Sequence, residues 1–130
     1  MSSPVHILLV EDDEDDITLF KLALKKLPFP VTLTILTEGD EVLSYLNTAT
    51  ERPDLVFLDL NLPRMHGRDV LRQTKGSVIG RLLPVFILTT SSAQGDIDYC
   101  LAHGAEQFLT KPASLAELVA MLTEVLARVR

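Results

Sequence analysis

The chain has 130 residues, 47% of them hydrophobic and 23% charged, which is the size and composition of one folded domain. Its net charge of −6 argues against nucleic acid as a direct partner, because phosphate binding needs a basic surface. The sequence shows no signal peptide, no apolar run long enough to cross a membrane and a single cysteine, Cys100, so we expect a cytoplasmic protein without internal disulfides.

The first part of the chain alternates between strand and helix patterns. The apolar run 5–10 predicts a strand and leads into six consecutive acidic residues. Apolar residues then recur at helical spacing, which predicts a helix beginning near Glu14. Threonines alternate with apolar residues over 31–36 and predict a second strand. Gly39 and Asp40 are predicted to open a second helix.

The central stretch predicts a strand that ends in a carboxylate. Four apolar residues at 55–58 leave no room for polar alternation, as is typical of a strand covered on both faces. Asp59 stands where this strand ends, and Pro63 and Gly67 mark the loop that follows. In open α/β folds, ligands bind at the carboxyl ends of the strands, so Asp59 is a candidate site residue. A strand-ending turn residue is the purely structural alternative.

The second half of the chain continues the alternation. The predicted elements are a helix ending near Gly76, a loop or helix tail over 76–83, a strand over 84–89, a helix closed by His103 and Gly104, a strand over 106–110, and a last helix that Ser114 and Glu117 cap. Ile97, Cys100 and Leu101 share the predicted buried face of the fourth helix. Five strand–helix units predict an α/β fold, a doubly wound parallel sheet with helices on both faces.

Polar side chains follow four of the five predicted strands. Glu11 and Asp12 follow the first strand, Asp59 the third, Thr89 ends the fourth and Lys111 follows the fifth. In a parallel sheet these groups meet at one edge, where three carboxylates repel one another unless a cation compensates. Mg²⁺ prefers such oxygen ligands. With the Lys111 ammonium and the Thr89 hydroxyl as donors, the pattern predicts a phosphoryl site whose acceptor is Asp59.

Four segments resemble the receiver domain of two-component response regulators. They are Ile-Leu-Leu-Val-Glu-Asp-Asp at 7–13, Leu-Asp-Leu-Asn-Leu-Pro-Arg-Met-His-Gly at 58–67, Leu-Thr-Thr at 88–90 and Phe-Leu-Thr-Lys-Pro at 108–112. They occur in the order of the family and span nearly the whole chain. The resemblance implies one flavodoxin-like domain over residues 1–130, with strand order 2-1-3-4-5. Because the chain ends about where its last helix ends, we expect no output domain.

The resemblance assigns the phosphoacceptor and the metal ligands. Asp59 would accept a phosphoryl group from a phosphohistidine on a sensor histidine kinase. Glu11, Asp12, Asp59 and the backbone carbonyl of Asn61 would hold Mg²⁺. Such a protein is a signalling switch that catalyses only its own phosphorylation and dephosphorylation.

The resemblance also assigns a switch. Thr89 and Lys111 would bind the phosphoryl oxygens as catalytic partners of Asp59. Phe108 occupies the aromatic position that in the family turns inward when the threonine moves. The peptide bond between Lys111 and Pro112 would be cis, as is common in the family.

A narrower resemblance concerns the partners. The segments 88–92 and 109–112, with the extension over 76–83, look most like single-domain regulators paired with phytochrome-type kinases. Members of that group often form homodimers, and Tyr99 and the last helix are candidate contacts. The downstream partner is not specified by the sequence.

Three other functions compete with this interpretation. A nucleotide or flavin binder would need a loop that cradles phosphate after the first strand, where this chain has six acids. A phosphohydrolase would need a second acid two positions after Asp59, where Asn61 stands. A receiver used only for docking is the strongest rival, although none of the key positions is missing. Glu11, His66 and Thr90 depart from the commonest family residues.

Overall fold

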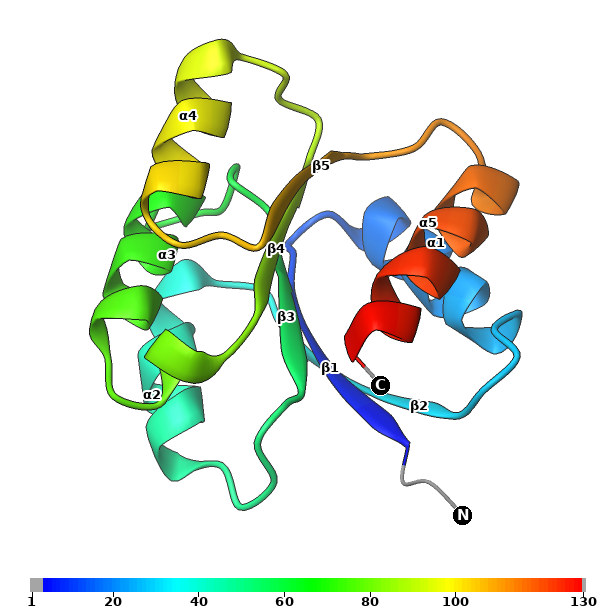
Figure 1. The fold of residues 1–130 in the computed structure, drawn as a ribbon, viewed down its shortest axis with the longest axis horizontal. Helices are drawn as coiled ribbons and strands as arrows, with labels where there is room; N and C mark the ends of the chain where they lie inside the picture. The colour runs from blue at the N-terminus through cyan, green and yellow to red at the C-terminus, as the bar shows by residue number, and fades with distance from the viewer. Residues whose placement is uncertain (1–3, 130) are drawn as a thin grey trace.

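The computed structural model describes residues 4–129, which form a parallel five-stranded sheet with helices on both faces (Figure 1). The strand order is β2-β1-β3-β4-β5, as predicted. The strands are β1 (Val5–Val10), β2 (Val31–Leu36), β3 (Leu55–Leu58), β4 (Val85–Thr89) and β5 (Gln107–Thr110). The α-helices are α1 (Glu14–Lys25), α2 (Val42–Thr48), α3 (Gly67–Gly76), α4 (Gln94–Ala102) and α5 (Leu115–Val129).

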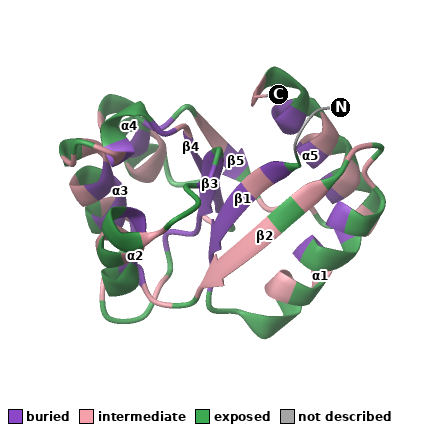
Figure 2. Cartoon of the chain, turned by 90° about the horizontal axis from the view of Figure 1, so that it is seen from below, coloured by how far each residue is buried: buried purple, intermediate pink, exposed green. Residues whose placement is uncertain are grey.

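Each face of the sheet carries its own hydrophobic core. Helices α1 and α5 cover one face, and α2, α3 and α4 cover the other (Figure 1). Because successive side chains of a strand point to opposite faces, β1 sends Ile7 and Leu9 to the first core and Leu8 and Val10 to the second. The central strand β3 is buried along its whole length, whereas the edge strand β2 is mostly half-exposed (Figure 2).

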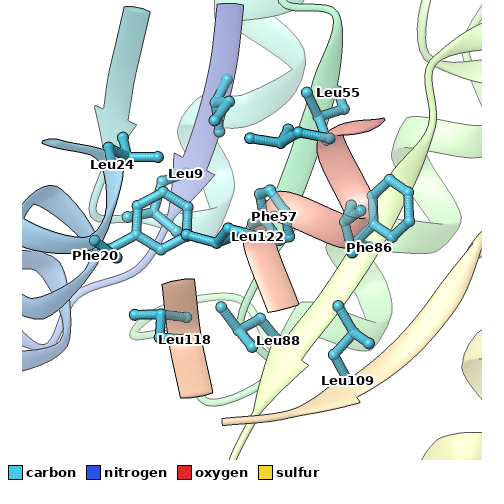
Figure 3. Close-up of a cluster of buried hydrophobic side chains, with 14 of the residues drawn as sticks. Leu9, Phe20, Leu24, Leu55, Phe57, Phe86, Leu88, Leu109, Leu118 and Leu122 are labelled. Atoms are coloured by element: carbon cyan, nitrogen blue, oxygen red, sulfur yellow. The ribbon is translucent and has the colours of Figure 1, made fainter. Parts of the chain in front are cut away.

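A row of three aromatic rings fixes α1 against the sheet. Phe20 of α1 meets Phe57 of β3 edge-on at 5.4 Å, and Phe57 stacks on Phe86 of β4 at 5.6 Å between ring centroids (Figure 3). Leu122 of α5 is fully buried in the same core. Buried aromatic side chains of this kind each stabilise a fold by about 2–3 kcal/mol. The anchored helix begins directly after the acidic loop, so this core also positions that loop.

Three details of the predicted elements differ from the structure. Gly39 begins a short 3₁₀ turn, η1 (Gly39–Glu41), and the α-helix itself begins at Val42. The predicted loop over 76–83 contains a second such turn, η2 (Gly80–Leu82). Leu101 is 49% exposed although Cys100 is fully buried, so the buried face of α4 is narrower than predicted. Within residues 4–129 no helix has the length and apolar character to cross a membrane.

Candidate functional site

The strand ends bring the predicted site residues to one edge of the sheet. The Asp59 N–H donates to the Val10 carbonyl at 3.1 Å, which sets the ends of β1 and β3 side by side. The Lys111 N–H donates to the Thr89 carbonyl at 2.8 Å and does the same for β4 and β5. Residues that are more than 40 positions apart in the sequence therefore share one site, as the parallel topology predicts.

Lys111 is the centre of the charged network. Its Nζ lies 2.7 Å from Glu11 Oε1, 3.1 Å from Asp59 Oδ2 and 2.6 Å from Asp16 Oδ2. The side chains of Glu11 and Asp59 are only 4% and 5% exposed, whereas that of Asp16 is 38% exposed. The ammonium donates hydrogen bonds to Asp16 and Asp59 and forms an ion pair with Glu11, so its positive charge is shared by three carboxylates.

Three carboxylates form a cluster that suits a metal ion. Glu11, Asp12 and Asp59 each offer an oxygen within 4.8 Å of the others, and Asp12 is exposed while its two neighbours are buried. The N–H groups of Asp12 and Asp13 both donate to Glu11 Oε2 at 3.2 Å, and the Asn61 N–H donates to Asp59 Oδ1 at 3.3 Å. A few carboxylate oxygens, one of them on the exposed Asp12, match the oxygen ligands that Mg²⁺ prefers in proteins.

Burial and neighbouring charges shift the pKa values of Glu11 and Asp59 in opposite directions. Burial, opposed by the hydrogen bond from Lys111 and helped by the charge of Asp59, raises the pKa of Glu11 to about 7. Burial alone would also raise the pKa of Asp59, but the Lys111 charge and hydrogen bonds from Glu11, Lys111 and Thr89 outweigh it and lower that pKa. Asp59 is therefore the carboxylate that stays ionised, as a nucleophile must.

The two predicted switch residues lie on adjacent strands. Thr89 is fully buried, and its hydroxyl accepts a hydrogen bond from the Ser91 N–H at 3.4 Å. The sheet register pairs Ile87 with Phe108, two positions before it pairs Thr89 with Thr110. Phe108 is half-buried and packs on the core beneath α2, α3 and α4.

One predicted feature of this edge is wrong. All described peptide bonds, over residues 4–129, are trans, including the bond between Lys111 and Pro112. The trans isomer of a bond before proline is the more stable by about 0.5–1 kcal/mol. In this isomer the Lys111 ammonium lies 3.1 Å from Asp59 Oδ2.

Two residues of the site were not predicted from the sequence. Asp16 belongs to the run of six acidic residues and lies in the first turn of α1, and nothing in its local pattern distinguishes it from Glu14 and Asp15. Gly67 was interpreted only as a loop marker. Its N–H donates to the Leu60 carbonyl at 2.9 Å, and a Cβ atom there would lie 2.5 Å from Leu60 Cα and against the Asp59 carbonyl. Gly67 thus lets α3 begin directly behind Asp59.

This fold and site define a class of protein. A doubly wound sheet that gathers an acidic cluster, a buried threonine and a lysine at its carboxyl edge is the architecture of a phosphoacceptor signalling domain. The family model described as the response regulator receiver domain matches residues 7–123, and the chain belongs to this family.

Individual relatives agree with the family assignment. The response regulator Rcp1 of Synechocystis sp. is 36% identical over 124 residues, which cover 92% of this chain and 84% of Rcp1. The crystal structure of the phosphorylated cyanobacterial phytochrome response regulator RcpA superposes with a TM-score of 0.87 at 33% identity and covers 95% of this chain and 91% of RcpA. The predicted resemblance, including its phytochrome-associated group, is confirmed.

Two similar structures contain a divalent ion. One is the Mn²⁺-bound form of Rcp1, with a TM-score of 0.84, 34% identity and coverage of 94% of this chain and 91% of that one. The other is the receiver domain of the sensor histidine kinase PA1611 from Pseudomonas aeruginosa, with magnesium coordinated in its active site cleft. It has a TM-score of 0.76 and 30% identity, and covers 94% of this chain and 97% of that one.

Proposed function

We propose that this receiver domain is a phosphorylation switch in which Asp59 accepts a phosphoryl group from a phosphohistidine of a sensor histidine kinase. The observation that carries the proposal is the meeting of three carboxylates and Lys111 at the edge of the sheet, beside the buried Thr89. Asp59 is the one member that is buried, ionised and bound to Lys111 at the same time.

The chemistry follows from the groups at this edge. An ionised oxygen of Asp59 attacks the phosphorus atom, the P–N bond to the kinase histidine breaks, and the released imidazole nitrogen takes a proton from solvent. Lys111 and the Thr89 hydroxyl donate hydrogen bonds to the phosphoryl oxygens. Glu11, Asp12, Asp59 and the backbone carbonyl of Asn61 would hold Mg²⁺, which when bound neutralises charge on those oxygens.

The switch follows from the same contacts. In the phosphorylated protein the Thr89 hydroxyl turns towards the phosphoryl group, and Phe108 moves into the space behind it. The half-buried position of Phe108 on the neighbouring strand supports this movement, because the ring can leave the surface without unfolding β5. The movement changes the surface formed by α4, β5 and α5, and it is a local charge event that biases a two-state element.

The relatives and the charge of the chain support three proposals about partners. The similarity to RcpA and Rcp1 favours a phytochrome-type histidine kinase as phosphodonor. Tyr99 and α5 are the proposed contacts of a homodimer. The net charge of −6 supports an output through protein contacts rather than direct binding to nucleic acid, and we propose a cytoplasmic location.

Acetyl phosphate with Mg²⁺, followed by intact mass measurement, tests the proposal. We expect a single phosphate adduct that is absent with EDTA and absent in Asp59→Asn. Asp54→Asn is the matched control, because Asp54 lies just before the same strand at the opposite end and is exposed. Wild-type protein that neither acetyl phosphate nor a kinase labels would leave docking without phosphorylation as the function.

A further inference from the structure

Asp16 is the partner of Lys111 that the proposed chemistry does not use. Its carboxylate lies outside the cluster of Glu11, Asp12 and Asp59, yet its ion pair with Lys111 is the shortest of the three that this ammonium makes. We propose that Asp16 is a positioning residue that competes with the phosphoryl group for Lys111 and so sets how strongly the phosphorylated state is held. The inference rests on the proposed function of the site.

Three carboxylates surround the Lys111 ammonium before a phosphoryl group arrives. Nζ donates hydrogen bonds to Asp16 Oδ2 at 2.6 Å and to Asp59 Oδ2 at 3.1 Å, and Glu11 Oε1 lies 2.7 Å away. A phosphoryl group on Asp59 therefore gains Lys111 as a full partner only when the ammonium turns away from Glu11 or Asp16. The free energy of losing the displaced partner is subtracted from the free energy gained with the phosphoryl oxygen.

Burial decides which partner is displaced. Asp59 itself carries the phosphoryl group, and Glu11 is almost fully buried, so leaving the Glu11 carboxylate without its cation would be strongly destabilising. Asp16 is 38% exposed, so water can replace the ammonium at its oxygens. A cavity of about 30 Å³, lined by Glu11, Asp16 and Lys111 among other residues, lies beside it and is large enough for a water molecule. Asp16 is therefore the partner that Lys111 can release.

The position of Asp16 is fixed by α1. Its N–H donates to the side chain of Asp13, the N-cap residue, at 2.9 Å. Phe20, one turn further along the helix, anchors α1 in the aromatic row. Because the backbone of Asp16 is held from both sides, its carboxylate stays within reach of Lys111 and can recapture the ammonium when the phosphoryl group leaves.

Beryllofluoride with Mg²⁺, a mimic of a phosphoryl group on aspartate, is the probe for this competition. We expect Asp16→Asn to bind the probe more tightly by about two- to fivefold, the range for a partly exposed ion pair. Asp15→Asn removes the same charge from the same exposed first turn of α1 and should leave the affinity within about 1.5-fold of the wild type. Asp16→Glu, which keeps the carboxylate, should return towards the wild-type value.

The outcomes separate this inference from the proposed function. Isothermal titration calorimetry of each variant, with Mg²⁺ alone and then with the probe, measures both affinities. Structural damage at Asp16 would weaken binding, whereas the competition strengthens it, so the sign of the change is decisive. Equal or weaker binding by Asp16→Asn, with a wild type that binds, overturns the inference alone. A wild type that does not bind the probe overturns the proposed function, and the inference with it.

Discussion

Replacing Gly67 with alanine tests how closely α3 is packed behind Asp59, the proposed phosphoacceptor. A Cβ atom at this position would lie 2.5 Å from Leu60 Cα and 3.1 Å from the carbonyl carbon of Asp59, and nearer still to its oxygen. These neighbours are backbone atoms, which cannot rotate away as a side chain can. Ordinary contact begins near 3.4 Å, so the start of α3 and the segment after β3 must separate by about 1 Å.

The cost of this separation can be worked out from its parts. Overpacking of a closely packed site costs about 1–3 kcal/mol, and weakening of the hydrogen bond from the Gly67 N–H to the Leu60 carbonyl adds about 1 kcal/mol. The total is about 2–4 kcal/mol. For a chain of 130 residues the entropy of unfolding is about 0.27 kcal/mol per kelvin, so we expect Tm to fall by about 7–15 °C.

Thermal unfolding followed by circular dichroism measures the effect, with Gly95→Ala as the control. Gly95 lies in α4 with no atom within 4 Å of the added Cβ, so alanine there should raise the free energy of unfolding by about 0.5–1 kcal/mol through helix propensity. The two glycine substitutions should thus change Tm in opposite directions. A Gly67→Ala protein that unfolds at or above the wild-type temperature would refute the close approach.

Two further predictions concern the first turn of α5 and the single cysteine. Ser114→Ala removes the oxygen that accepts the Glu117 N–H at 3.1 Å at the start of α5, so it should lower the free energy of unfolding by about 1 kcal/mol and Tm by about 4 °C, while Ser114→Asp should not. Burial, together with the charge of the nearby Asp96, raises the pKa of the Cys100 thiol to about 11, so the reactive thiolate is scarce at pH 8. We expect Ellman's reagent to modify the native protein at least about 100-fold more slowly than the urea-unfolded protein, with a rate that rises with pH; equal rates would contradict the buried thiol.

The sheet could be predicted from the sequence because its signals are local. A strand of four apolar residues without polar alternation is stable only when helices cover both faces of the sheet. Residues 55–58 form such a strand, β3, and all four are buried. Once the strands are parallel, their carboxyl ends must share an edge, which is why the sequence alone predicts that Glu11, Asp59, Thr89 and Lys111 lie together.

The features that could not be predicted depend on contacts between distant segments. Asp16 meets Lys111 across 95 positions, and only the packing of α1 on the sheet brings them together. Arg64 adopts a left-handed backbone with φ of 66°, and it pairs at 3.5 Å with Glu38, which lies in the loop after β2. Glycine and asparagine are the usual residues in the left-handed conformation, so an arginine at position 64 does not predict a positive φ.

A continuous chain of contacts leads from the site to the surface of α4, and it gives the proposed switch a second route besides Phe108. The Ser91 N–H donates to the Thr89 hydroxyl, and the Ser91 hydroxyl donates to Asp96 at 2.7 Å. Asp96 pairs with Arg68 of α3 at 3.5 Å, and the Arg68 guanidinium lies 3.9 Å from the centre of the Tyr99 ring. We infer that a Thr89 hydroxyl drawn towards a phosphoryl group no longer accepts from Ser91, so the loop that fixes Asp96 is freed to move. When Asp96 moves, Arg68 loses part of its ion pair, and its contact with the Tyr99 ring changes. Phosphorylation would thereby alter Tyr99, the residue proposed to contact a second copy of the chain.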